Sequence, residues 1–564
     1  MANHNRQLIM RRAKRIFTLQ LPIANCLLPT GHCLLLTAYC LLSTSAFSQV
    51  WISDQGNGTY KNPVIHADYS DPDVVRVGND FYMTASSFDA VPGLPILHSK
   101  DLVNWTIIGH ALKQQVPIEH FSKTQHGNGV WAPAIRYHKD EFYIYYPDPD
   151  FGLYLTKAKN ISGPWSEPVL VEGGKGLIDP CPLWDDDGKI YLVHAYAGSR
   201  AGIKSIIVVK QLNEDGTKVI DQGKIVYDGH EHDPTIEGPK FYKRNGYYYI
   251  FAPAGGVATG WQTVLRSKNV YGPYERKVVM DQASTPINGP HQGAWVDTPS
   301  GEDWFIHFQD KGVYGRVVHL QPMKWVSDWP IIGVDEDEEG KGQPALTYKK
   351  PHVTDTTGIK TPQESDEFNS NELGLQWQWQ ANPKVTWLFP DSVRGSLRLY
   401  SQIIPEGAKN HWSAPNILLQ KFPAEQFTVT AKLTFTPNPK LENEKAGLIV
   451  MGRSFASLYL KSKSDGVYVA YTICKNANKD EVENEFILTK TTKNEIYLRI
   501  KVLKDATCAF SVSLDGKKFM EIKETFHAEA GQWVGAKVGL FCTRTTQTND
   551  SGYVDVDWFR VEKN

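Results

Sequence analysis

The sequence of 564 residues lacks an excess of charge of either sign. Lysine and arginine total 60, aspartate and glutamate total 62, and the formal net charge is −2. A chain without a basic face is not expected to bind nucleic acid. We therefore expect a partner that is uncharged or of mixed charge.

Cysteine is scarce as well, with seven residues in the whole chain. Three of them fall within the first 48 residues. The other four are Cys181, Cys474, Cys508 and Cys542. So few thiols spread over about 500 residues do not make a disulfide scaffold, and none of them shows the CxxC spacing of a metal site.

A long apolar run that would suit a membrane span is also missing. Residues 1–48 begin with basic residues and continue into an apolar region that Pro29 and His32 interrupt. The small residues Ala46 and Ser48 then suit a signal peptidase. We predict a signal peptide over 1–48 and export to the periplasm or the exterior, with no membrane contact after its removal; a retained membrane anchor is the alternative.

Helical periodicity is rare, and short runs rich in tyrosine, phenylalanine, valine and isoleucine predict an all-β protein. A polar turn followed by an aromatic strand occurs five times before residue 310, with turns that start at Asn79, Asp140, Asp187, Asn245 and Glu302. These intervals suit the four-stranded blades of a propeller. The sequence therefore predicts a five-bladed β-propeller over 49–334.

Three acids share one position of this repeat. Eight residues before the five turns lie Asp71, Ala132, Asp179, Glu237 and Ala294. Equivalent positions of neighbouring blades should meet at the central axis. Carboxyl groups crowded in this way separate their pKa values, as a general acid and a general base require.

At these residues the chain resembles glycoside hydrolase family 43, which has five-bladed propellers and includes β-xylosidases and α-L-arabinofuranosidases. The segments that carry the likeness lie within residues 60–330 and include "YSDPDVV", "WAPAI", "DPCPLW" and "EGPKFY". The resemblance implies that Asp71 is the general base, Glu237 the general acid, and Asp179 the residue that tunes the pKa and orients. It also implies inversion at the anomeric carbon, with about 6.5–9.5 Å between the two working carboxyl groups.

The same resemblance suggests further contacts with substrate. Trp131 is expected to pack against a sugar face, Arg316 to contact sugar hydroxyls, and His291 to face the axis, each with a structural role as the alternative. Phe88 is kept, but Asp89-Ala90-Val91 stands where many β-xylosidase relatives carry Glu-Trp-Phe. We further expect Glu237 to have a raised pKa, with the tyrosines at 247–249 forming a poorly solvated wall beside it.

A second domain follows a polar linker at 335–364. Alternating runs from 365 to 564 predict a β-sandwich, which resembles the jelly-roll, concanavalin-like domain of β-xylosidase-type relatives. Asp366 and Asp557 could share a structural calcium, although solvated carboxylates are the alternative; no cofactor is expected to be required. In such relatives the second domain closes one end of the pocket, which favours cleavage of terminal sugars.

We therefore predict an exo-acting, inverting glycosidase that releases terminal β-D-xylose or α-L-arabinofuranose from plant hemicellulose oligosaccharides. One alternative is a non-catalytic carbohydrate-binding propeller, and another is an arabinan- or galactan-cleaving member of the same family. A fructan-cleaving relative would carry an Asn-Asp-Pro-Asn motif, which "YSDPDVV" lacks. The sequence does not select between the two pentoses and predicts no oligomeric state.

Overall fold

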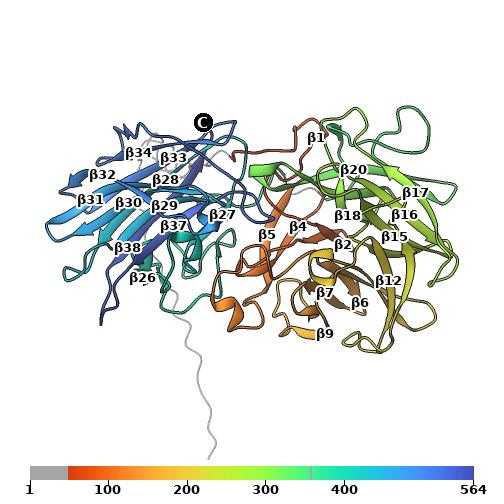
Figure 1. Ribbon diagram of the computed structural model, residues 1–564. Coiled ribbons are helices and arrows are strands. Elements are labelled where there is room, and N and C mark those ends of the chain that lie inside the picture. Colours follow the sequence, from red (N-terminus) through yellow and green to blue (C-terminus); the bar gives the residue numbers. More distant parts are fainter. Residues whose placement is uncertain (1–48, 356–357) are drawn as a thin grey trace, which may run out of the picture. The chain divides into compact units, whose positions relative to one another are not determined.

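The computed structural model describes residues 49–355 and 358–564, so the predicted signal peptide lies outside the described residues. The described part belongs to one compact unit. It is built almost entirely from strands (Figure 1). In this part of the chain no helix is long and apolar enough to span a membrane.

Five four-stranded antiparallel sheets follow one another along the chain, and they confirm the five-bladed propeller. Each sheet uses four consecutive strands in sequence order. The first two blades contain β2 (Asp73–Val77), β3 (Asp80–Thr84), β4 (Gly93–Ser99), β5 (Trp105–Leu112), β6 (Ala134–His138), β7 (Glu141–Asp148), β8 (Gly152–Ala158) and β9 (Val169–Gly173). The other three contain β10 (Leu177–Trp184), β11 (Ile190–Tyr196), β12 (Ile206–Leu212), β13 (Lys224–Asp228), β14 (Lys240–Arg244), β15 (Tyr247–Ala254), β16 (Trp261–Ser267), β17 (Glu275–Met280), β18 (His291–Asp297), β19 (Asp303–Asp310), β20 (Arg316–Val326) and β21 (Trp329–Ile332).

No blade combines strands from the beginning and the end of the propeller domain. Instead β1 (Thr59–Lys61) pairs with β22 (Thr347–Lys349), on the segment that follows the fifth blade. The side chain of Asn62 donates to the carbonyls of Leu320 and Ala345 at 2.8 Å each. The predicted linker therefore contains a strand that holds the first residues of the propeller.

Two eight-stranded sheets form the sandwich, as predicted. One contains β23 (Gln378–Trp379), β26 (Gln402–Ile403), β27 (Leu418–Lys421), β29 (Lys445–Met451), β30 (Phe455–Lys463), β31 (Gly466–Cys474), β32 (Asn484–Thr491) and β37 (Lys537–Arg544). The other contains β24 (Leu388–Asp391), β25 (Ser396–Tyr400), β28 (Phe427–Thr436), β33 (Glu495–Val502), β34 (Thr507–Ser513), β35 (Met520–Glu521), β36 (Phe526–His527) and β38 (Tyr553–Glu562). Alternate residues of these strands fill the core between the sheets, for example Val429, Ala431 and Leu433 on β28.

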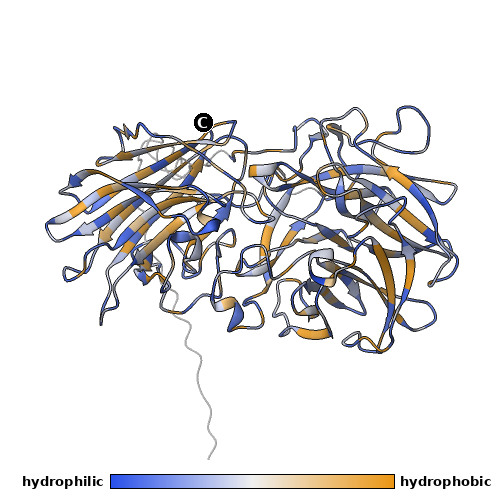
Figure 2. Ribbon diagram, in the orientation of Figure 1, coloured by the Kyte–Doolittle hydropathy of each residue, from blue (hydrophilic) through white to orange (hydrophobic). Residues whose placement is uncertain are grey.

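Short helical turns complete the described structure. They are η1 (His120–Ser122), α2 (Gly198–Ala201), η2 (Gly312–Tyr314), η3 (His411–Ser413) and η4 (Ala477–Lys479). Apolar segments lie mainly on the strands (Figure 2). The four cysteines of this part of the chain are buried and free.

Candidate active site

The first strands of the blades bring the three predicted acids to one pocket. Asp71 lies just before β2, Asp179 lies within β10, and Glu237 lies just before β14. All three line a cavity of ≈ 260 Å³. Its other lining residues are Phe88, Trp131, Ala132, Ile178, Thr235, Gly256, Val257, Gln292, Arg316 and Trp533.

Asp71 is buried and accepts hydrogen bonds from several donors. Its Oδ2 accepts from Ser70 Oγ at 2.7 Å and from Ser86 Oγ at 2.5 Å. The guanidinium of Arg316 lies 3.3 Å from Oδ1 and donates to Ser70 Oγ at 2.8 Å. These contacts fix the orientation of the carboxylate. A general base needs a fixed orientation, because it must accept a proton from a water held in one place.

Asp179 lies deepest, with 2% of its surface exposed. Its Oδ2 accepts from the amide of Gly238 at 2.7 Å and from Gln292 Nε2 at 3.3 Å. Burial, and then the negative charges of Glu237 and Asp71, raise the pKa of Asp179 to about 8. A pocket of this kind disfavours three ionised carboxyl groups, so it retains an acid proton near neutral pH.

Glu237 is held by its backbone and by one histidine. Its amide donates to the carbonyl of Pro253 at 3.0 Å. Its Oε1 lies 3.0 Å from Nε2 of His291, which is fully buried. His291 therefore contacts the predicted acid directly, and it is not among the residues that line the cavity.

The fifth blade departs from the predicted register. Ala294 pairs with Ile306 inside the sheet and packs in an apolar core, away from the cavity. The turn between β18 and β19 spans residues 298–302, and the count starts at Glu302, the last of them, so it places the position two residues after Gln292, which lines the cavity. His291 and Gln292 occupy the place that was assigned to Ala294.

The predicted tyrosine wall is wrong. Residues 247–249 start β15 at the hairpin turn, whereas Glu237 lies at the opposite end of the hairpin, beside Pro253. Tyr248 donates to Asp185 at 2.6 Å, and Tyr249 donates to the carbonyl of Asp328 at 2.8 Å. In an antiparallel hairpin the start of the second strand lies far from the start of the first, so the tyrosines lie at the end of the hairpin away from Glu237.

Three of the other residues that were predicted to contact substrate lie in the wall of the cavity. Phe88, Trp131 and Arg316 line the cavity, and their contact with substrate stays a prediction. Trp533, which sequence reasoning missed, comes from the sandwich and meets Trp131 with ring centroids 6.2 Å apart at 70°. A tryptophan from another domain thus borders the pocket of a chain that lacks the expected tryptophan after Phe88.

The two acids predicted to share calcium have other partners. The ammonium of Lys432 lies 2.5 Å from Asp557 Oδ2. Asp366 accepts from the indole of Trp377 at 3.0 Å and from the amide of Phe368 at 2.9 Å. No group of three or more ligating side chains occurs among the described residues. A lysine ammonium on one of the two carboxylates does not fit a shared cation.

Comparison with known proteins identifies both parts of the chain. Residues 60–330 match the model of glycosyl hydrolases family 43, and residues 365–562 match that of the beta xylosidase C-terminal concanavalin A-like domain. A putative beta-xylosidase of Xylanibacter ruminicola is 40% identical over 493 residues, which cover 87% of each protein. A non-reducing end alpha-L-arabinofuranosidase of Bacteroides ovatus is 30% identical over 525 residues, covering 89% of this chain and 94% of the relative.

A crystal structure of a xylan beta-1,4-xylosidase from Bacillus halodurans agrees with the fold. Its TM-score is 0.79 at 25% identity, over 89% of this chain and all of that one. The family match covers the three acids, and the long relatives cover propeller and sandwich together. The chain therefore belongs to glycoside hydrolase family 43, with the concanavalin-like domain of its β-xylosidase branch, and is a glycosidase.

Proposed function

We propose that this protein is an exo-acting, inverting glycosidase that releases terminal β-D-xylose or α-L-arabinofuranose from plant hemicellulose oligosaccharides. The observation that carries the proposal is the convergence of Asp71, Asp179 and Glu237 on one cavity. The names of the relatives, which include both β-xylosidases and an α-L-arabinofuranosidase, support this range of sugars.

In the proposed reaction Asp71 is the general base. A water between Asp71 and the sugar attacks the anomeric carbon, and Asp71 accepts its proton as the new C–O bond forms. Oδ1 of Asp71 has only the 3.3 Å contact with Arg316, whereas Oδ2 accepts from two serines. Oδ1 therefore has the freer lone pair for the water.

Glu237 donates its proton to the leaving oxygen as the old C–O bond breaks. The contact with His291 fixes the position of Oε1, and the side chain stays one-quarter exposed at the cavity. Asp179, protonated near neutral pH, lowers the negative charge around Glu237. After release of both products, Asp71 returns its proton to solvent and Glu237 regains one.

Cleavage of terminal sugars is favoured by the walls of the cavity. Trp131 and Trp533, on opposite domains, stand together at one side of it. Aromatic side chains of this kind pack against sugar faces. A pocket bordered by a second domain suits the end of a chain better than its interior.

The decisive experiment compares Glu237→Ala with Glu231→Ala, an exposed acid of the same loop. Glu237→Ala should abolish hydrolysis of natural xylosides while keeping much of the activity on aryl glycosides with a good leaving group, which needs no acid. Glu231→Ala should behave as the wild type. Equal inertness of the wild type and Glu237→Ala on every pentoside would leave only carbohydrate binding.

Two further measurements define the reaction. Proton NMR should show the opposite anomer as the first product, and retention would contradict Asp71 as a base. Parallel assays of an aryl β-xyloside and an aryl α-L-arabinofuranoside would identify the preferred sugar.

Export is part of the proposal, with residues 1–48 as the signal peptide. The partner is an oligosaccharide or polysaccharide, and neither nucleic acid nor membrane takes part after signal removal. The proposed chemistry uses carboxyl groups and water and needs no cofactor. A calcium shared by Asp366 and Asp557 is not part of the proposal, because the ammonium of Lys432 lies on Asp557. Addition of calcium or of a chelator should therefore leave the melting temperature unchanged.

A further inference from the structure

The loop that leads into Arg316 is embedded in the sandwich. Tyr314, between β19 and β20 of the fifth blade, packs in the sandwich core. Its hydroxyl donates to the carbonyl of Lys504 at 2.6 Å. The amide of Ala536 donates to the carbonyl of Val313 at 2.7 Å. Two domains therefore determine the path of the chain just before Arg316.

One buried carboxylate ties this loop to a loop of the sandwich. Asp68 is 5% exposed. Its Oδ1 accepts from the amide of Arg316, and its Oδ2 accepts from the amide of Gly535, both at 2.9 Å. Each oxygen thus satisfies one backbone donor, and each donor belongs to a different domain.

The backbone around Asp68 leaves no room for side chains. Gly315 has φ +75°, and a Cβ there would lie 2.5 Å from Cγ of Asp68. A Cβ on Gly535 would lie 2.6 Å from the amide nitrogen of Gly315. Glycine at both positions lets the two loops approach the carboxylate closely enough for both bonds.

Each amide that Asp68 holds lies beside a residue of the cavity wall. Arg316 carries its guanidinium to Ser70 and Asp71. Trp533, two residues before Gly535, has φ +64° and borders the same cavity. A side chain other than glycine in this conformation is strained and persists only where its surroundings hold it.

We propose that Asp68 is a positioning residue that couples the sandwich to the active site by holding the amides of Arg316 and Gly535 on one carboxylate. This inference depends on the proposed function in one respect, namely that Asp71 and Arg316 belong to the active site. Loss of Asp68 frees Arg316 to leave Asp71 and frees the loop of Trp533, although neither side chain is altered.

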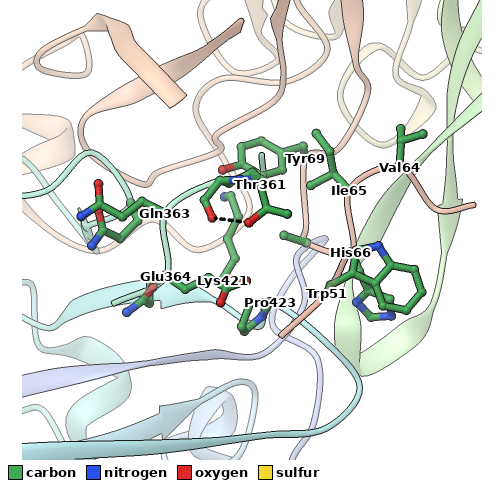
Figure 3. A pocket seen from close by; sticks show the side chains of 14 residues that line it. Trp51, Val64, Ile65, His66, Tyr69, Thr361, Gln363, Glu364, Lys421 and Pro423 are labelled. Atoms are coloured by element: carbon green, nitrogen blue, oxygen red, sulfur yellow. Dashed lines mark hydrogen bonds between the residues drawn. The ribbon is translucent and has the colours of Figure 1, made fainter. Parts of the chain in front are cut away.

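A nearby lysine supplies a competing explanation. Tyr69, the residue after Asp68, lines a small pocket of ≈ 40 Å³ together with Lys421 (Figure 3). The ammonium of Lys421 lies 5.2 Å from the Tyr69 ring. Burial, and then the charge of Lys537, lower the pKa of Lys421 to about 8, and the charge of Asp68 opposes this. Asp68 could therefore act only as a counter-charge to Lys421.

A double-mutant cycle on the full-length enzyme separates these roles. Asp68→Ala should lower kcat/KM on the preferred aryl pentoside by up to about 10²-fold, because a displacement of about 1 Å at a reacting group has this cost. In an Arg316→Ala background the same change should have a smaller effect, limited to the part that acts through the loop of Trp533, since coupled residues are not additive. Full additivity, or an equal loss in Lys421→Met, would overturn the proposal.

The matched control is Asn382→Ala. Asn382 also joins the two domains, through hydrogen bonds with the backbone of Gln115 at 2.8 and 3.0 Å, but it does not border the cavity. It should lower the melting temperature and leave kcat/KM near the wild-type value. If Asn382→Ala lost as much activity as Asp68→Ala, both losses would be due to a general weakening of the contact between the domains.

Hydrogen exchange tests the inference without enzymatic activity. Asp68→Asn, which keeps the side-chain volume but has one acceptor oxygen for two amides, should speed exchange in peptides that contain Arg316 and Gly535. Asn382→Ala should speed exchange around Gln115 instead. Unchanged exchange of both segments in Asp68→Asn would reject the proposal even if the wild type hydrolyses pentosides. A wild type inert on all pentosides would reject the proposed function alone.

Discussion

Replacing Asp179 by asparagine should stabilise the folded protein at neutral pH while removing activity. The asparagine keeps an oxygen for the amide of Gly238 but has no proton to lose. In the wild type, burial and then the charges of Glu237 and Asp71 raise the pKa of Asp179 from 3.8 to about 8. The carboxyl group therefore lowers the free energy of unfolding at every pH at which it is ionised in the unfolded chain.

The sign follows from the protons bound in each state. The unfolded Asp179 loses its proton near pH 4, whereas the folded one keeps it until about pH 8. Between these values the folded state binds more protons, so the free energy of unfolding falls as the pH rises. At 1.36 kcal/mol for each pH unit, Asp179 costs at most about 4 kcal/mol at pH 7 and almost nothing at pH 4.

The assay is the difference in melting temperature between Asp179→Asn and the wild type, measured from pH 4 to pH 8. We expect it to rise steadily with pH from near zero. Asp185, in the first hairpin turn of the same blade, is the matched control. Burial raises its pKa, but hydrogen bonds from Lys243 and Tyr248 outweigh this and lower it, so Asp185→Asn should destabilise at neutral pH. A difference for Asp179→Asn that does not vary with pH, or is negative at pH 7, would refute the reasoning.

Two substitutions test the geometry of the site, and thiol labelling tests the burial of the cysteines. His291→Ala should lower kcat by up to about 10²-fold with little change in KM, because Glu237 loses its partner; a change in KM alone would contradict this. Gly238→Ala should lower both activity and melting temperature, since the residue has φ +60° and its Cβ would lie 2.4 Å from Cγ of Gln292; wild-type behaviour would argue against the backbone described. In a protein that lacks residues 1–48, a thiol reagent should label no cysteine before denaturation and four after it, by mass spectrometry, because all four are buried.

Local signals predicted most of the fold. The turn before each second strand is set by residues next to one another, such as Asn79 or Asn245, and all five turns lie where the sequence placed them. The acids of the first, third and fourth blades follow from the same repeat. Ala294 was misplaced because the count started at Glu302, the last residue of the turn at 298–302, whereas in the equally long turn at 185–189 it started at the middle residue, Asp187. Residues inside a strand pair give a better origin than residues in a loop of variable length.

Trp533 could not be found in this way. It lies in the second domain, and its place in the cavity depends on the contacts of Gly535 and Asp68. Such contacts join segments more than 400 residues apart, and no periodic pattern encodes them. The one available signal was a tryptophan between glycines, in "AGQWVG".

The backbone at Asp71 and Asp179 adopts the same uncommon conformation. Both residues have φ between +55° and +58°, and both precede a proline. A positive φ is uncommon for aspartate, and a following proline restricts the backbone further. Such conformations cost about 1–3 kcal/mol each and persist where surrounding structure enforces them. In two separate blades the packed strands therefore hold an acid in the same strained conformation, and this directs both carboxyl groups into one cavity.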